Sequence, residues 1–141
     1  MTININLNKN ALIGAAACVA GLLLALGPQF LFTACPQHEH DGAWSRCHWS
    51  VQAILGTGII IAALGLCMVF LSDLKTHIGL NIGIFLSAIV TLAFPYSLIG
   101  GCGSHEMRCW KVAFPAVTVI SIVILAGSAA YMIYLMKKAK A

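Results

Sequence analysis

The amino-acid sequence predicts an all-α integral membrane protein, a bundle of four transmembrane helices. Its 141 residues are 60% hydrophobic and only 9% charged, whereas a soluble domain is usually nearer half apolar and a quarter charged. Four separate apolar runs contain no Lys, Arg, Asp or Glu. Each run is close to the ~20 residues that a helix needs to cross the hydrocarbon layer. The surrounding solvent is therefore expected to be lipid.

These runs divide the chain without leaving room for a second domain. A charge at the bilayer centre costs at least about 2.5–3.5 kcal/mol, so charge-free runs mark the spanning segments. We expect one domain over residues 1–141. Its helices are predicted at 11–32, 50–71, 78–99 and 112–135, and its outer loops at 33–49 and 100–111.

The first run is predicted to be a packed helix. Gly14 and Gly21 supply a small-residue face, and such faces let membrane helices approach closely. Cys18 is expected to be a packing thiol. Residues 31–35 also resemble the cleavage signal of a lipid-anchored secreted protein. However, the apolar run is far longer than the roughly 7–15 residues of a signal core, so we expect a retained helix.

The second run and the turn after it carry two further reactive side chains. Cys67 is interpreted as a packing thiol within the helix. His77 follows in a short turn, where a solvated histidine at the membrane edge is expected, although a proton carrier is the alternative.

The third and fourth runs contain more small and polar residues. Gly79-x-x-x-Gly83 favours close contact with another helix, and Asn81 is expected to hydrogen-bond a neighbouring helix. Residues 126–130 form another small-residue patch.

The two halves of the chain share an order of residues. Each has a proline, a cysteine seven residues later, and an Arg-Cys segment with a tryptophan before the next helix. The first set is Pro28, Cys35 and 46–49, and the second is Pro95, Cys102 and 108–110. This pattern predicts two similar helical hairpins, related by a pseudo-two-fold axis along the membrane normal.

Basic residues predict the orientation. One side holds Lys9, Lys75, Lys137, Lys138 and Lys140, and the other holds Arg46, Arg108 and Lys111. The positive-inside rule then places both termini in the cytoplasm. We expect the membrane to be the cell (plasma) membrane. The net charge of +4 describes a membrane-facing rim, so nucleic acid is not expected as a partner.

The two outer loops hold most of the reactive side chains. The candidate ligands there are Cys35, Cys47, His48, Cys102, Met107 and Cys109. One interpretation is structural, because cysteines outside the cytoplasm usually form disulfides. The pairs would be Cys35–Cys47 with Cys102–Cys109, or a crosswise alternative that ties the hairpins together.

A second interpretation is a soft-metal or haem site. Thiolates and the Met107 thioether select Cu(I), or zinc where four thiolates converge. The imidazole of His48 suits zinc, copper or haem iron, as do those of His38, His40 and His105.

A third interpretation is thiol chemistry. Four helices with two cysteines in each outer loop resemble the layout of quinone-linked disulfide-generating enzymes, and neighbouring arginines favour thiolates. The usual Cys-x-x-Cys is absent, however. Such a membrane thiol-disulfide oxidoreductase would need a quinone-sized pocket beside a reactive cysteine pair.

At Cys35, residues 47–49, Gly101-Cys102 and Met107-x-Cys109, the chain resembles an uncharacterised bacterial family of small four-helix membrane proteins, domain of unknown function family 4418. The resemblance covers nearly the whole chain. It implies the four-helix fold and the importance of these positions, but no settled activity. Some relatives accompany ABC-type export systems, which implies a partner permease.

We therefore expect a non-enzymatic accessory membrane protein with a Cys/His/Met cap outside the cell. No serine or carboxylate catalytic set and no nucleotide motif is evident in the sequence. The expected partners are the lipid bilayer and either an ABC-type permease or further copies of the chain.

Overall fold

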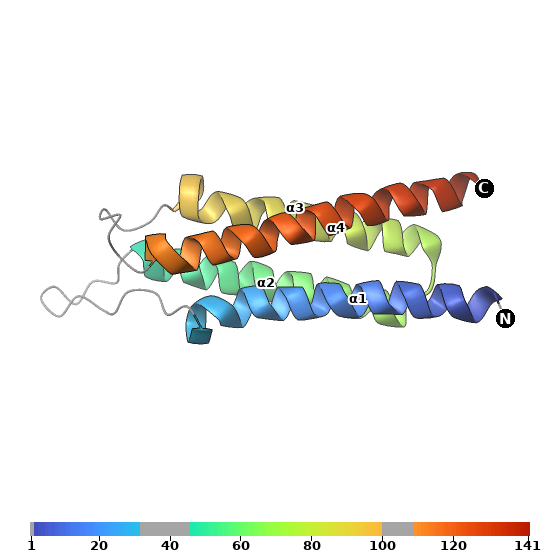
Figure 1. The fold of residues 1–141 in the computed structure, drawn as a ribbon, viewed down its shortest axis with the longest axis horizontal. Coiled ribbons are helices and arrows are strands. Elements are labelled where there is room, and N and C mark those ends of the chain that lie inside the picture. The colour runs from blue at the N-terminus through green and yellow to red at the C-terminus, as the bar shows by residue number, and fades with distance from the viewer. Residues whose placement is uncertain (1, 32–45, 100–108) are drawn as a thin grey trace, which may run out of the picture.

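The computed structural model describes residues 2–31, 46–99 and 109–141 and is a bundle of long helices (Figure 1). The helices in chain order are α1 (Thr2–Leu26), η1 (Gly27–Leu31), α2 (Arg46–Phe70), α3 (Leu74–Ala93), η2 (Phe94–Leu98), η3 (Cys109–Ala113) and α4 (Phe114–Lys140), where η marks a π-helical turn. Within these ranges there is no strand. The predicted all-α four-helix fold is confirmed.

The four long helices run antiparallel along one axis, and both chain termini lie at the same end of the bundle (Figure 1). We call this the terminal end and the opposite end, where α2 and η3 begin, the loop end. The short connection between α2 and α3 also lies at the terminal end, while residues 32–45 and 100–108 connect helices at the loop end.

All four helices are long and apolar enough to cross a membrane, which is the organisation of a multi-pass membrane protein. The candidate spans are Lys9–Leu31, His48–Phe70, Leu74–Leu98 and Trp110–Lys140. At the terminal end, α1 and α4 continue past the apolar runs into polar sequence, because Thr2–Asn10 and the lysine-rich tail are also helical.

Large apolar side chains cover the outside of the bundle. Leu22, Ile60, Leu86 and Val119 are each at least 45% exposed, and they come from four different helices. A soluble protein rarely exposes so continuous an apolar surface. Contact with lipid hydrocarbon explains it.

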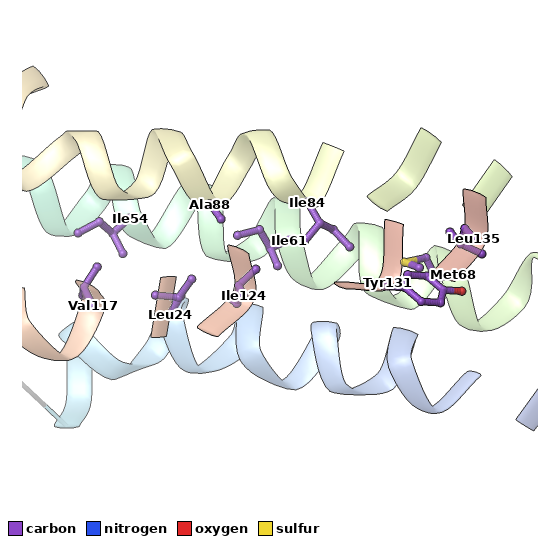
Figure 2. Packing of buried hydrophobic residues seen from close by; sticks show 10 residues of the cluster. All are labelled: Leu24, Ile54, Ile61, Met68, Ile84, Ala88, Val117, Ile124, Tyr131 and Leu135. Atoms are coloured by element: carbon purple, nitrogen blue, oxygen red, sulfur yellow. The ribbon is translucent and has the colours of Figure 1, made fainter. Parts of the chain in front are cut away.

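The inward faces follow a seven-residue repeat. On α4 the buried positions are Phe114, Val117, Ser121, Ile124, Ser128, Tyr131 and Leu135, at alternating steps of three and four. The buried positions of α3 and η2 show the same steps, from His77 to Pro95. This spacing is typical of coiled-coil-like packing in helical bundles. Figure 2 shows the resulting row of core side chains along the bundle, from Ile54 and Val117 to Met68 and Leu135.

The tightest contact joins α1 to α2 through glycines. A Cβ added at Gly58 would lie 2.6 Å from the backbone nitrogen of Ala25, and one at Gly65 would lie 2.8 Å from the carbonyl oxygen of Gly14. Gly21 meets the backbone of α2 in the same way. The predicted small-residue face of the first helix is thus confirmed.

Two other sequence interpretations are wrong. The Gly79-x-x-x-Gly83 motif does not bring the backbone of α3 close to that of another helix. A Cβ at Gly79 would meet nothing within 4 Å, and one at Gly83 would meet only the side chain of Leu64. Cys67 is exposed on the bundle surface rather than packed inside it, because it falls outside the seven-residue stripe of α2.

The first and third helices end alike at the loop end. Pro28 and Pro95 are each the second residue of a five-residue π-helical turn, and each is buried. Proline cannot donate the usual helical hydrogen bond, and such a site favours a wider turn. This likeness agrees with a duplicated hairpin. The α1–α2 pair packs more extensively than the α3–α4 pair, however, and the pseudo-two-fold axis stays a prediction.

Replacing Gly58 by alanine should destabilise the bundle by about 1–3 kcal/mol, because the new methyl group would enter the backbone of α1. The measurement is the unfolding temperature of the detergent-purified protein. Gly56→Ala, two residues away in the same helix, is the matched control because a Cβ there meets nothing within 4 Å. Equal unfolding temperatures for the two variants would contradict the role of Gly58.

Candidate functional site

The terminal end of the bundle contains a buried polar network centred on His77. This side chain is only 1% exposed. Its Nε2 lies 2.6 Å from the carbonyl oxygen of Leu71, and its Nδ1 lies 3.1 Å from the hydroxyl of Tyr131. The two rings also meet edge to face, with centroids 6.4 Å apart.

Tyr131 extends the network to the first helix. Its hydroxyl lies 3.3 Å from Oδ1 of Asn10 and donates to it. Asn10 belongs to α1, Leu71 directly follows α2, His77 belongs to α3 and Tyr131 belongs to α4. One chain of side-chain hydrogen bonds therefore links all four helices.

The partners determine where the protons of this network lie. A carbonyl oxygen only accepts hydrogen bonds, so Nε2 of His77 carries a proton and donates to Leu71. Nδ1 is then the acceptor nitrogen of the ring. The Tyr131 hydroxyl lies within hydrogen-bond distance of both Nδ1 and Oδ1 of Asn10, and its single proton can be donated to only one of them at a time.

The expectation of a solvated His77 is therefore wrong. The histidine occupies the first position of the buried stripe of α3, and the short turn before it brings the carbonyl of Leu71 within reach. Asn10 and Tyr131 were not expected as its partners. The spacing of Tyr131 could have indicated its burial. It lies three residues after Ser128 and ten after Ser121, which are buried polar residues in an otherwise apolar helix.

Asn81 behaves as the sequence predicted. Its Nδ2 donates to the carbonyl oxygen of Ser128 at 2.9 Å, which joins α3 to α4. Both residues line a cavity of about 590 Å³ that also contacts α1 and α2. A second cavity of about 40 Å³ lies beside His77 and Asn10 and has room for a water molecule.

The larger cavity occupies the terminal half of the bundle, along the α1–α4 seam. Its walls are almost entirely apolar, and Lys9 is the charged residue among them. The α1 and α4 helices contact each other far less than α1 contacts α2. The four helices thus form a ring that is loosely closed on one side.

Most of the predicted ligands at the loop end lie outside the described residues. These are Cys35, Cys102 and Met107, together with His38, His40 and His105. Cys47 and Cys109 are described as helix positions only, at the starts of α2 and η3, and these two starts lie at the same end of the bundle (Figure 1). Among the residues that the structure describes, no three His, Cys, Asp or Glu side chains form a metal-binding group.

His48 and Trp49 follow Cys47 at the start of α2, and Trp110 follows Cys109 in η3. His48 is half-buried and packs edge to face on Trp49, with ring centroids 5.9 Å apart. Trp49 is 59% exposed, as expected for a side chain at the lipid surface. Trp110 instead packs on Phe114 at 5.1 Å, and Phe114 also contacts Tyr96. This aromatic group joins η2 to the start of α4.

Tyr131→Phe should destabilise the protein by about 1–3 kcal/mol, because it removes the hydroxyl that pairs with the buried Nδ1 of His77 and with Oδ1 of Asn10. Tyr96→Phe is the matched control. Its partner, the hydroxyl of Thr118, also bonds the carbonyl of Phe114 and stays satisfied. Thermal unfolding in detergent measures both, and an equal loss in the two variants would contradict the special importance of the network.

Comparison with known proteins places the chain in a family. A search of curated proteins gives no match, and a search of solved structures gives none either. The sequence model of one family matches residues 17–135, which include the last ten residues of α1, all of α2 and α3, and most of α4. The chain therefore belongs to the family described as Domain of unknown function (DUF4418).

Proposed function

We propose that the protein is a non-enzymatic accessory membrane protein whose two loops form a Cys/His/Met cap at the loop end. In the disulfide form, Cys35, Cys47, Cys102 and Cys109 are bonded in pairs. In the metal form, the same thiolates bind copper, zinc or haem iron together with His48 and Met107. The cap senses or presents a component outside the cell.

The observation that carries this proposal is the common position of two helix starts. The starts of α2 and η3 bring the backbones of Cys47 and Cys109 to the same end of the bundle. This common end supports a site that combines Cys47 and Cys109, which are 62 residues apart in sequence, with the cysteines of the two loops. A soft metal requires such convergence of thiolates, and so does a crosswise disulfide.

The position of the larger cavity favours this role over a quinone-linked oxidoreductase. An oxidoreductase would hold its quinone next to the reactive cysteines. The cavity of about 590 Å³ instead contacts Lys9, Asn81 and Tyr131 in the terminal half of the bundle, far along the helices from Cys47 and Cys109.

In the proposed arrangement, the protein lies in the plasma membrane. The terminal end of the bundle faces the cytoplasm. Five lysines lie near that end, at the starts of α1 and α3 and at the end of α4. The positive-inside rule favours this arrangement. The cap then faces the outside, where disulfides persist.

An accessory role also requires a surface for a larger partner such as an ABC-type permease, or for another copy of the chain. The small residues Ala126 and Ala129 are exposed on α4 and provide a face that another helix can approach closely.

Thiol alkylation with elemental analysis tests the cap. Cys18 and Cys67 are free thiols and serve as internal references. In the disulfide form, denatured protein should expose two alkylatable thiols before reduction and all six after it. In the metal form, six thiols should react without reductant, and near-stoichiometric copper, zinc or iron should be present. His48→Ala and Met107→Leu should then lower the metal content.

One control variant sharpens this experiment. Cys67→Ser should remove one reference thiol without changing the outer four or the metal content. Six free thiols with no bound metal would contradict the proposed cap.

Reporter fusions at the C-terminus test the orientation. Because the lysine-rich end is proposed to be cytoplasmic, a fused fluorescent protein should fluoresce and a fused alkaline phosphatase should be inactive. The same reporters inserted in loop 33–45 should give the opposite pattern. An active phosphatase at the C-terminus would refute the proposed topology.

A further inference from the structure

We propose that the larger cavity binds one hydrocarbon chain of an anionic membrane lipid, with the lipid head group at Lys9. The cavity combines an apolar interior with one cationic residue, which is the pattern that an anionic amphiphile requires. This site lies in the terminal half of the bundle and is separate from the cap.

The cavity passes from the outer surface to the bundle core. Its rim includes Leu12 and Val123, which are 69% and 65% exposed, and its floor includes Met68 and Ile84, each 2% exposed. Residues from all four helices line it. An occupant that enters from the lipid therefore reaches the centre of the molecule.

The contact between α1 and α4 favours a hydrocarbon chain over a helix as the occupant of the cavity. Small residues create the opening, with Ala16 and Ala20 on α1 facing the side of Gly127 and Ala130 on α4. The two helices still contact each other, and the bond from Tyr131 to Asn10 holds them together at the terminal end. A helix is about 10–12 Å across with its side chains and could only cover this seam. A flexible hydrocarbon chain can enter it.

The dimensions of the cavity match one lipid chain. Its volume of about 590 Å³ is several times that of the roughly 150 Å³ cavity that binds benzene in an engineered protein. Along α1 the lining runs from Lys9 to Ala20, about 16 Å of helix at a rise of 1.5 Å per residue. This depth is roughly half of a 30 Å hydrocarbon core, the part that the chains of one leaflet occupy.

The charge around the entrance selects an anionic head group. Lys9 begins the first span, so its ammonium group lies at the level of the head groups. The end of α4 adds Lys137, Lys138 and Lys140 at the same end of the bundle. Asp73 is the sole acidic residue within the described ranges, and it accepts a hydrogen bond from Thr76. The resulting positive potential attracts anionic lipid over zwitterionic lipid.

Photo-crosslinking of reconstituted full-length protein tests the site. The probes are phosphatidylglycerol and phosphatidylcholine that carry the same diazirine-labelled acyl chain, each diluted into vesicles of unlabelled lipid. Phosphatidylglycerol should label peptides from 12–20 of α1 and 123–134 of α4 preferentially, and phosphatidylcholine should label them several times less. Excess unlabelled phosphatidylglycerol should compete, whereas inorganic phosphate should not.

Matched variants separate the site from general lipid contact. Gly127→Leu should fill the cavity and abolish the preferential labelling, because a Cβ there meets nothing within 4 Å and the bundle need not rearrange. Gly79→Leu is equally unhindered but lies outside the cavity and should leave labelling unchanged. Lys9→Gln should reduce phosphatidylglycerol labelling about fivefold, the effect of one lysine near the membrane surface, while Lys75→Gln should not.

Three outcomes would overturn the proposal. Labelling spread evenly over all outward faces would indicate ordinary surrounding lipid. Equal labelling by the two head groups would remove the role of Lys9. Crosslinks from this seam to a second copy of the chain would show that a protein, not a lipid, covers it.

Discussion

Lipid around the bundle removes the hydrophobic driving force for helix packing. An apolar side chain that moves from lipid to a neighbouring helix stays in an apolar environment, so the move brings no hydrophobic gain. Close backbone contact and hydrogen bonds must supply the association instead. The glycines of the α1–α2 contact meet this requirement. At Gly58 and Gly65 the backbone of α1 lies so close to α2 that it occupies the space where the Cβ of any other residue would be. The remaining helices assemble around this pair.

The polar network complements the glycine contact at the terminal end. An unsatisfied polar group costs more in hydrocarbon than in water, so a buried histidine needs its partners in place. His77 obtains them from Leu71 and Tyr131, and Tyr131 in turn reaches Asn10. The glycines hold α1 and α2 together by close packing of their backbones. The network instead links all four helices by hydrogen bonds. It also makes the α1–α4 side, with its cavity, depend on one phenol group.

The spans were predictable because length and absence of charge suffice to identify them, and both are properties of the sequence alone. The side of each helix that faces inward was not predictable from hydrophobicity, because outward positions such as Leu86 and Val119 are as apolar as the core. The small and polar residues carry that information. Their seven-residue spacing, as in Ser121 and Ser128, marks the buried stripe. The burial of His77 was not predictable for a different reason, because one of its partners, Tyr131, is 54 residues away in sequence.

The candidate cap was predictable as a set of residue types but not as an arrangement. The pattern of Cys47 and Cys109 before their helices assigns both to one side of the membrane, which agrees with their helix positions. Distances between thiols depend on loop conformation, however, and neither hydropathy nor spacing encodes it. The cavity was not predictable from the sequence either. Small residues such as Ala16 and Ala20 are found both where helices pack closely and where a cavity opens between them.

The uneven packing of the helices also implies an order of assembly in the membrane. The α1–α2 contact is complete once the first 70 residues have inserted, and it needs nothing from the rest of the chain. The network cannot close until α4 brings Tyr131 beside His77. Until then the histidine has only the carbonyl of Leu71 as a partner. α4 thus completes the polar network, and a chain in which α4 has not yet packed leaves Nδ1 of His77 without its partner.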